Sequence, residues 1–300
     1  MLLVTGATGN IGRELIRELA AMGAETRLLV RDPARAAALL PEHVAQIELV
    51  VGDLDVPATL PRSFAGIDKV FLLTAGMDTA HTAHAVAAAQ AAGVGHIVHV
   101  SSSNVLGDPM PAMGRWHHAR EKIIRASGVP VTFLRPGNFM SNALGWATTI
   151  RAGGYVLDPL GPGRVASIDP ADIAAIAALV LTDDGAAHHG EAYVLTGDEP
   201  LTVAEQVQII AKTIGHDIEV RPAATPAEAA RSRFPDGAPQ ALVDAITEVF
   251  VRLRADTVGF QTDTTRRLLG RRPRTFADWC TQHADAFRVP SPGYADSPHT

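Results

Sequence analysis

Three glycines spaced three residues apart follow a short aliphatic run near the start of the chain, and this pattern constrains the fold most. The run Leu2–Thr5 has the composition of a buried strand, and the sequence GATGNIG comes directly after it and opens a helical segment. In such a unit the first glycine permits a tight turn, the second lets the backbone approach a pyrophosphate, and the third lets the helix pack on the strand. The helix N-terminus then faces the anion. The alternative is a glycine-rich turn that binds nothing. The pattern predicts a dinucleotide site formed by Gly6, Thr8, Gly9, Asn10, Ile11 and Gly12.

The first half of the chain alternates aliphatic runs with Ala/Leu-rich segments of helical spacing, which is typical of repeated βα units. The runs are almost entirely aliphatic, as expected of parallel strands buried on both faces. Glycines at the ends of the helical segments suit the left-handed residue that closes a helix. We therefore predict an α/β protein with a doubly wound, parallel-sheet Rossmann fold. The predicted strands are Leu2–Thr5, Glu25–Val30, Ile47–Val51, Lys69–Thr74, His96–Ser101 and Val131–Leu134.

The pattern changes after residue 140, where glycines and prolines interrupt about twenty residues and predict a loop over a cleft. We predict a dinucleotide-binding core at 1–145, completed by about 166–198, a substrate region at 146–165 and 199–290, and a loose tail at 291–300. Asp169 begins a predicted helix in the completing segment. The later elements expected are helix Ile173–Leu181, strand Ala192–Thr196 and helices Thr202–Ile214, Ala238–Arg254 and Pro273–Phe287.

Composition and charge exclude several classes of protein. Of the 300 residues, 47 % are hydrophobic, which is enough for a substantial core. The net charge is −6 at pH 7, with none of the basic clusters that nucleic-acid binding requires. The longest aliphatic stretch, around Ala174–Leu181, is less than half of the roughly 20 residues of a membrane helix, and no signal peptide precedes the first strand. We expect a cytoplasmic protein that binds neither nucleic acid nor membrane.

Histidine and cysteine positions predict no metal site. His81 and His84 are three residues apart, and His188 and His189 are adjacent, but no carboxylate completes a metal-binding signature at either place. Cys280 is the only cysteine, so an internal disulfide or a thiolate cluster is excluded. We expect Cys280 to be a buried structural thiol.

Motifs along most of residues 1–285 resemble one family. They are GATGNIG in the first turn, RLLVRDP and VVGDLDVP after the second and third strands, HIVHVSSSNV at the fifth, SGVPVTFLRPGNFMSNAL at the sixth, and DPADIAAIAALVL and RTFADW later. Together they resemble the NmrA-like family of the atypical short-chain dehydrogenase/reductase superfamily. The resemblance implies an NAD(P)-binding Rossmann fold. Members of the family include quinone reductases, other reductases and redox-sensing regulators without turnover.

The end of the second predicted strand indicates which cofactor is bound. Arg31 stands there, followed by Asp32. An arginine pairs with the 2′-phosphate of NADP(H), and in the family the Arg-Asp pair goes with that cofactor. The alternatives are a surface ion pair for Arg31, or ribose binding by Asp32, which would admit NAD(H). Asp53 and Leu54 resemble the pair that contacts adenine in relatives, the alternative being a solvated loop. The remaining predicted cofactor contacts, at the ends of later strands, are Thr74, Ala75, Gly76, Ser101, Pro136 and Asn138.

The usual catalytic pair of the superfamily is missing. Most members use Tyr-x-x-x-Lys, in which tyrosine protonates the substrate carbonyl and lysine lowers the tyrosine pKa. Here the residues four positions after the three tyrosines are Pro159, Gly197 and Pro298, so the pair does not exist. Alignment of the helix places Met113 and His117 at the two positions. The standard carbonyl reduction is therefore not expected.

Other residues are candidates for the chemistry. Ser102 and Ser103 follow the fifth strand, near the usual position of a catalytic serine in the superfamily; turn or cap hydrogen bonding is the alternative. His117 has an intrinsic pKa near neutrality, which suits an acid or a ribose ligand, and a surface histidine is its alternative. A flat aromatic substrate is expected to bind near residues that are otherwise core: Phe139, Met140 and Trp146.

Two functions fit these features. The favoured one is NADPH-dependent reduction of a quinone or a polycyclic aromatic ketone or enone, whose reduced oxygen needs little help from an enzymic acid. The other is a non-catalytic redox sensor that acts through a protein regulator or other partner. The alanine-rich, arginine-over-lysine composition suggests a GC-rich bacterial genome, and with it a natural-product pathway with a partner oxygenase. The sequence does not predict the oligomeric state.

Overall fold

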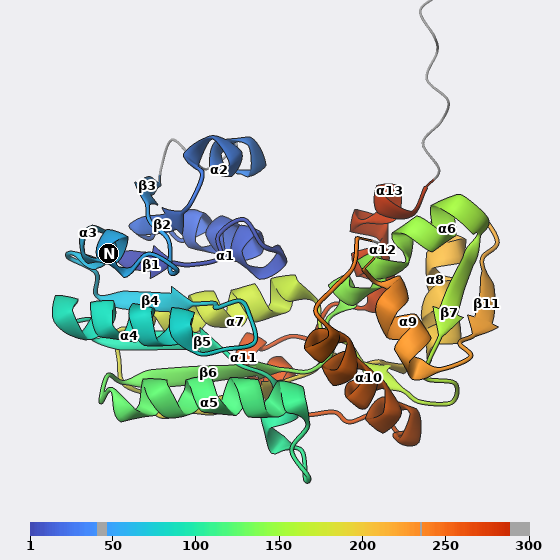
Figure 1. Ribbon diagram of the computed structural model, residues 1–300. Coiled ribbons are helices and arrows are strands. Elements are labelled where there is room, and N and C mark those ends of the chain that lie inside the picture. Colours follow the sequence, from blue (N-terminus) through green and yellow to red (C-terminus); the bar gives the residue numbers. More distant parts are fainter. Residues whose placement is uncertain (41–46, 235, 289–300) are drawn as a thin grey trace, which may run out of the picture.

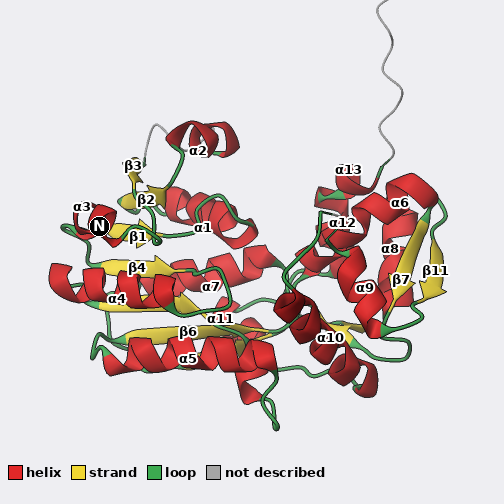
Figure 2. Cartoon of the chain, viewed as in Figure 1, coloured by secondary structure: helices red, strands yellow, loops and turns green. Residues whose placement is uncertain are grey.

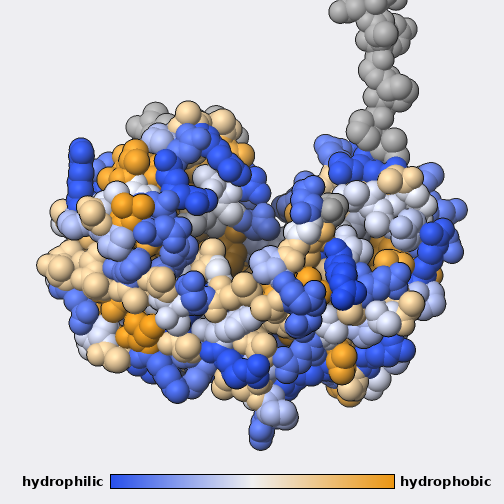
Figure 3. Space-filling view, in the orientation of Figure 1, coloured by the Kyte–Doolittle hydropathy of each residue, from blue (hydrophilic) through white to orange (hydrophobic). Residues whose placement is uncertain are grey.

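The structure is a computed structural model that describes residues 1–40, 47–234 and 236–288. Its elements form two lobes, which lie side by side in Figure 1 and are separated by a notch on the face drawn in Figure 3. The first lobe contains a parallel sheet with the strand order β3-β2-β1-β4-β5-β6-β9. Its strands are β1 (Leu2–Val4), β2 (Thr26–Val30), β3 (Glu48–Val51), β4 (Lys69–Leu72), β5 (His96–Val100), β6 (Val131–Pro136) and β9 (Ala192–Leu195).

Successive residues of the strands enter two different cores. In β1, Leu2 and Val4 pack with α1, α2 and α7 on one face of the sheet, whereas Leu3 packs with α3, α4 and α5 on the other. This burial on both faces explains why the strands are aliphatic almost throughout. The first-lobe helices and short 3-10 turns are α1 (Asn10–Ala21), α2 (Pro33–Leu39), η2 (Pro57–Thr59), α3 (Leu60–Phe64), α4 (Ala80–Ala92), η3 (Ser103–Leu106), α5 (Ala112–Ala126), α7 (Pro170–Thr182) and α11 (Thr264–Leu269).

The second lobe has its own core, in which Trp279 stacks on Phe276 and meets Phe287 edge-on. Two small sheets support it: β7 pairs with β11 in parallel, and β8 pairs with β10 antiparallel. Its elements are η4 (Met140–Trp146), α6 (Ala147–Gly153), β7 (Tyr155–Asp158), β8 (Val165–Ala166), β10 (Pro200–Leu201), α8 (Val203–Ile214), β11 (Glu219–Pro222), α9 (Pro226–Ser232), α10 (Gln240–Ala255), α12 (Phe276–Gln282) and α13 (Ala284–Phe287).

The predicted fold class is confirmed. Each of the seven strands predicted for the large sheet is present, with ends that differ by one or two residues. Asp169 accepts a hydrogen bond from the N–H of Ala171 and caps α7, as its position predicts. Thr202 and Glu205 form a capping box at the start of α8. The predicted tail lies outside the described residues.

Two predictions about the second lobe are wrong. The segment predicted as an irregular loop contains α6 and β7, which Figure 2 shows as a helix followed by a strand. Gly154 closes α6 with a φ of 63°, so the glycines separate regular elements instead of preventing them. The single helix predicted over Pro273–Phe287 is two short helices, α12 and α13, which are separated at His283. The first of them begins later than predicted, because Thr275 caps it.

Cys280 is buried, and burial raises the pKa of its thiol to about 12, which makes it a structural residue. Within the described ranges, no helix combines the length and apolar character needed to cross a membrane.

Candidate active site

The glycine turn after β1 is shaped by close backbone packing. Gly6 has a φ of 66°, which favours glycine, and its carbonyl accepts a hydrogen bond from the N–H of Gly9 at 3.0 Å. A Cβ atom on Gly12 would lie 2.2 Å from the same carbonyl oxygen, so a side chain has no room there. No side chain in the described part of the chain caps the first turn of α1, which leaves its backbone N–H groups for an anion. These features fit a pyrophosphate.

A cleft with a volume of about 290 Å³ runs from this turn across the carboxyl ends of β2, β3 and β4. Parallel sheets bind ligands at this edge. Asn10, Ile11 and Gly12 form the first turn of α1, which begins at the glycine turn. The structure also brings two residues to the cleft that the sequence analysis missed, Arg35 and His81. The predicted cofactor residues that line the cleft are Gly6, Thr8, Arg31, Asp53, Leu54 and Ala75.

The arrangement at the end of β2 favours a phosphate over a bare ribose. Arg31 and Arg35 both line the cleft, so two guanidinium groups are available to an anion. The carboxylate of Asp32 accepts a hydrogen bond from the backbone N–H of Arg35 at 3.0 Å and caps α2. Because one carboxylate oxygen of Asp32 already accepts a hydrogen bond from α2, this side chain is less suited to accept hydrogen bonds from both ribose hydroxyls. The Arg35 signal was visible in the sequence as a second arginine four residues after Arg31.

The loop after β3 is held by the two histidines of α4. His84 Nδ1 donates to the carbonyl of Leu54 at 2.6 Å, and His81 Nε2 lies 2.7 Å from a carboxylate oxygen of Asp55. Asp53 accepts from the N–H of Asp55 at 3.0 Å, which tightens the same turn. The histidine pair therefore positions the predicted adenine loop. Within the described residues, no group of three or more His, Cys, Asp and Glu could hold a metal.

The loop after β4 is tied to α5. Gly76 has a φ of 87°, and its carbonyl, together with that of Asp78, accepts hydrogen bonds from the Arg120 guanidinium. Thr74 lies 3.4 Å from Thr82, measured between hydroxyl oxygens. The predicted contacts Thr74, Ala75 and Gly76 thus lie together in a loop that α5 fixes from the other side.

His117 lies one turn before Arg120 on α5. Burial and the nearby Arg120 charge lower the pKa of His117 to about 4, so the ring is neutral at pH 7. Its buried Nδ1 atom has no hydrogen-bond partner among the described residues. Burial thus lowers the pKa of His117 from its intrinsic value near neutrality, which disfavours the imidazolium form at this position. The neutral ring still has one donor and one acceptor nitrogen to offer a ligand.

The serines after β5 have different partners. Ser102 caps η3 by accepting from the N–H of Asn104 at 3.2 Å, which is the alternative that its position left open. Ser103 begins η3, and its hydroxyl oxygen would lie 3.9 Å from a Cβ atom on Gly137. It therefore faces the loop after β6, where Pro136 ends the strand.

Ser101, predicted to contact the cofactor, is part of a buried network. Its hydroxyl donates to Glu121 at 2.6 Å, and Arg135 binds the same carboxylate through two nitrogens at 2.8 and 2.6 Å. Burial alone would raise the pKa of Glu121, but the hydrogen bonds from Arg135 and Ser101 outweigh it and leave that pKa below its ordinary value. The network fixes the ends of β5 and β6 relative to α5.

A second cavity begins at Asn138 and extends into the second lobe. The Asn138 side chain donates to Ser167 at 2.8 Å and accepts from Asn142 at 2.8 Å, while its carbonyl accepts from the N–H of Ile168 at 2.8 Å. The cavity volume is about 30 Å³, which is room for only a few water molecules. Its polar and aromatic lining includes Asn138, Asn142, Trp146, Gln206, Arg233 and Phe250.

Only one of the three predicted substrate residues lines this cavity. Trp146 does, whereas Met140 is 2 % exposed in the core of the second lobe and Phe139 packs against the core of the first. The sequence left core packing open for all three. Gln206, Arg233 and Phe250 could not be assigned to a site from the sequence, because they come from three separate helical segments far from Asn138.

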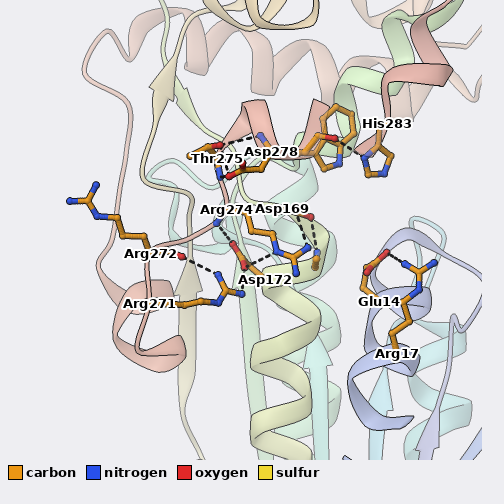
Figure 4. A network of polar contacts seen from close by, with 12 residues as sticks. Glu14, Arg17, Asp169, Asp172, Arg271, Arg272, Arg274, Thr275, Asp278 and His283 are labelled. Carbon is orange, nitrogen blue, oxygen red and sulfur yellow. Dashed lines mark hydrogen bonds and ion pairs between the residues drawn. The ribbon is translucent and has the colours of Figure 1, made fainter. Parts of the chain in front are cut away.

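A charged network joins the two lobes (Figure 4). Asp172 of α7 is fully buried and accepts from the Arg271 guanidinium at 2.7 Å and from the backbone N–H of Arg274 at 2.7 Å. The Arg274 guanidinium lies 4.0 Å from Asp169, and burial raises the pKa of that carboxyl. The contacts attach the segment before α12 to the N-terminal end of α7.

Comparisons with known proteins agree with this geometry. The chain is 37 % identical over 288 residues to (4-alkanoyl-5-oxo-2,5-dihydrofuran-3-yl)methyl phosphate reductase of Streptomyces griseus, with 96 % of this chain and 99 % of the relative covered. It is 36 % identical to NAD(P)H azoreductase of Xenophilus azovorans, with the same shares covered. The structure of NADPH-dependent quinone oxidoreductase from Escherichia coli in complex with NADPH matches with a TM-score of 0.80 and 27 % identity, covering 94 % of this chain and 99 % of that one.

The sheet order, the glycine turn and the cleft at the strand ends define a Rossmann protein that binds a nicotinamide dinucleotide. The chain belongs to the NAD(P)H-binding family, whose model matches residues 6–184. The predicted NAD(P)-binding family and the NAD(P)H cofactor are confirmed, and the structure of the regulator NmrA, at 22 % identity, shares the fold with a TM-score of 0.71. Because the relatives at 36 and 37 % identity are reductases, the chain is an NAD(P)H-dependent reductase.

Proposed function

We propose that this reductase uses NADPH to reduce a quinone or a polycyclic aromatic ketone or enone. The observation that carries the proposal is the missing Tyr-x-x-x-Lys pair on α5, where Met113 and the neutral His117 occupy the usual Tyr and Lys positions. A reduced quinone oxygen is stabilised by its ring and takes a proton from water, so this acceptor class does not need an enzymic tyrosine.

The two tyrosines of the described ranges are engaged elsewhere. The Tyr155 ring on β7 lies under the Arg221 guanidinium, 4.1 Å from its carbon to the ring centroid. The Tyr193 hydroxyl bonds to His188 at 2.8 Å. Neither residue lines the cofactor cleft or the second cavity. The proposal therefore assigns no proton donation to tyrosine.

The relatives support a conjugated acceptor. Quinone oxidoreductase 2 of Escherichia coli is named for a quinone, the Xenophilus protein for an azo compound, and the Streptomyces protein for an unsaturated lactone that carries a methyl phosphate. All three classes accept a hydride into a conjugated system. We favour the quinone class because an acceptor of that class needs no enzymic acid.

The residues divide the work of binding and orientation. The nicotinamide, when bound, supplies the hydride. The glycine turn and the first turn of α1 hold the pyrophosphate, and Arg31 and Arg35 hold the 2′-phosphate. Asn138, at the start of the second cavity, orients the acceptor relative to the cofactor cleft. Ser103 and His117 are the candidates to donate a hydrogen bond to the acceptor oxygen.

The sensor function that the sequence left open is the less favoured alternative, because the named relatives at 36 and 37 % identity carry out turnover. A partner oxygenase or a regulator protein is not required by the proposed reaction.

Anaerobic NADPH consumption with a panel of benzo-, naphtho- and anthraquinones tests the proposal. We expect saturable turnover with one quinone class, after NADPH binding has been confirmed by fluorescence. The variant Gly9→Val, which blocks the pyrophosphate position, is the matched control and should show no turnover. Tight NADPH binding without turnover on any quinone would reject the proposal and favour the sensor.

A further inference from the structure

Among the described residues that line the second cavity, Arg233 is the only charged one. Arg233 follows the end of α9, and its stem packs against Gly145, where an added Cβ atom would lie 3.7 Å from the arginine Cγ. Its guanidinium carbon lies 5.1 Å from the centroid of the Phe250 ring, which also lines the cavity. The arginine is therefore fixed at the cavity wall by an aromatic face and a backbone contact.

The positive charge of Arg233 has no counterion within the described residues. No ion pair or hydrogen bond joins its guanidinium to any of them, and the described cavity lining contains no Asp or Glu. Burial, the only cause at work, lowers the pKa of Arg233 to about 10, so the side chain remains protonated at pH 7. Arg233 is half-buried, and a partly desolvated cation without a counterion would be stabilised by an anion that enters the cavity.

The neighbouring polar groups also suit a small anion. Asn142 and Gln206 supply side-chain amides beside Arg233, and Gln206 is 5 % exposed with only one long hydrogen bond, 3.5 Å to the carbonyl of Leu201. The cavity volume of about 30 Å³ is too small for a flat ring system unless side chains move. Room for a few water molecules suits a small polar group such as a carboxylate or a phosphate better than a naphthalene ring.

We propose that Arg233 binds an anionic substituent of the substrate, a carboxylate or a phosphate monoester, and that the preferred substrate is therefore a conjugated acceptor with such a group. This inference rests on the proposed function in one respect: it identifies the bound anion as part of the substrate. The anion site itself rests only on the cavity and its unpaired arginine. Its test is therefore built from binding first and turnover second.

Binding is measured by calorimetry with probes that cannot be reduced: 2-naphthoate against 2-naphthamide, and 1-naphthyl phosphate against 1-naphthol. We expect one or both anions to bind at least about 10-fold more tightly than the matched neutral compound, since hydrogen bonds between charged groups are the strong ones. The pair with the larger ratio identifies the anion class. Equal affinities in both pairs would overturn the proposal.

Variants locate the site. Arg233→Met keeps an apolar stem on Phe250 and should abolish the preference for the anion, whereas Arg233→Lys should retain part of it. Arg231→Met, on the exposed side of α9, makes the same change in net charge and should leave the preference unchanged. Thermal unfolding checks that each variant is folded, and Arg233→Gln replaces the Met variant if that one is not. A preference that survives both Arg233→Met and Arg233→Gln would place the anion elsewhere and overturn the proposal.

Turnover separates this inference from the proposed function. We compare a naphthoquinone that carries a propanoate side chain with its methyl ester. The saturated chain separates the carboxyl group from the quinone ring, so the two compounds have similar intrinsic reactivity. A difference in kcat/KM between them therefore measures the effect of the carboxylate on binding. We expect the acid to be preferred about 10-fold or more, through KM, and the preference to disappear in Arg233→Met. If no quinone is reduced but naphthoate still depends on Arg233, the proposed function fails and the anion site stands. If the ester is reduced as well as the acid and both naphthyl pairs bind equally, the anion site fails alone.

Discussion

The cofactor cleft and the second cavity are formed from different parts of the chain. The cleft has a volume of about 290 Å³ and is formed by the turns at the ends of successive strands. The cavity has a volume of about 30 Å³ and is formed by side chains from segments between Asn138 and Leu253. Backbone turns leave a local pattern in the sequence, whereas long-range side-chain packing does not. Under the proposed function, the first site would bind the cofactor shared by the family, and the second would select the acceptor.

The network around Asp172 connects the two lobes that contain these sites, so its loss should have the largest effect. Asp172→Ala removes a fully buried carboxylate, so the backbone N–H of Arg274 loses its partner and the Arg271 guanidinium keeps only its bond to the carbonyl of Arg272. We expect the free energy of unfolding to fall by about 2 to 4 kcal/mol, discounted for the partial exposure of Arg271. Urea denaturation measures the loss.

Asp278→Ala is the matched control for Asp172→Ala. It removes an exposed capping box at the start of α12 and should cost only about 1 kcal/mol. If the two variants were equally stable, the buried network would not be what holds the last helices to α7, and the two lobes would be coupled in another way.

A valine at position 9 should block NADPH binding in the cofactor cleft without disturbing the fold. In Gly9→Val, the new Cβ atom meets only the Gly6 carbonyl oxygen at 3.3 Å, and the backbone at this position is extended. The valine should exclude the pyrophosphate and weaken NADPH binding on the order of 100-fold, about 2.7 kcal/mol, with little change in stability. Fluorescence titration measures the affinity.

Gly93→Ala gives the reverse pattern and serves as the control. Gly93 closes α4 with a φ of 73°, so alanine should cost about 1 kcal/mol of stability and leave NADPH affinity unchanged. Unaltered affinity in Gly9→Val would show that the glycine turn does not hold the pyrophosphate.

Cofactor selection should depend on the two arginines at the end of β2. Arg31→Met and Arg35→Met should each weaken NADPH by about 10-fold and NADH by much less, because only NADPH has the 2′-phosphate. Arg62→Met, on the exposed part of α3, changes the net charge equally and should affect neither cofactor. Equal losses for NADPH and NADH would remove the assigned role of Arg31 and Arg35.

The same contrast explains how far the sequence could be interpreted. Strand positions and the glycine turn follow from local composition, and the cleft residues Thr8, Arg31 and Asp53 follow from strand ends. Arg233 and Gln206 carry no local signal, since the packing of α8, α9 and α10 brings them to Asn138. Gly153 and Gly154 were misinterpreted because a glycine pair ends a helix as readily as it forms a loop.

The smallest expected effect concerns His117, whose chemistry depends on burial that the sequence does not show. Its pKa of about 4 in the fold lies below the ordinary value of 6.5, so the unfolded chain binds a proton that the folded one does not between these values. This contribution to stability is fully present above about pH 6.5 and is lost as the pH falls toward 4. His117→Gln should therefore make the acid decline in unfolding free energy less steep, while His96 and His99, whose pKa values burial also lowers, contribute to the decline in the same direction. In the wild type, kcat should show no inflection near pH 6.5, and an inflection that vanished in His117→Gln would instead identify an imidazolium acid at the site.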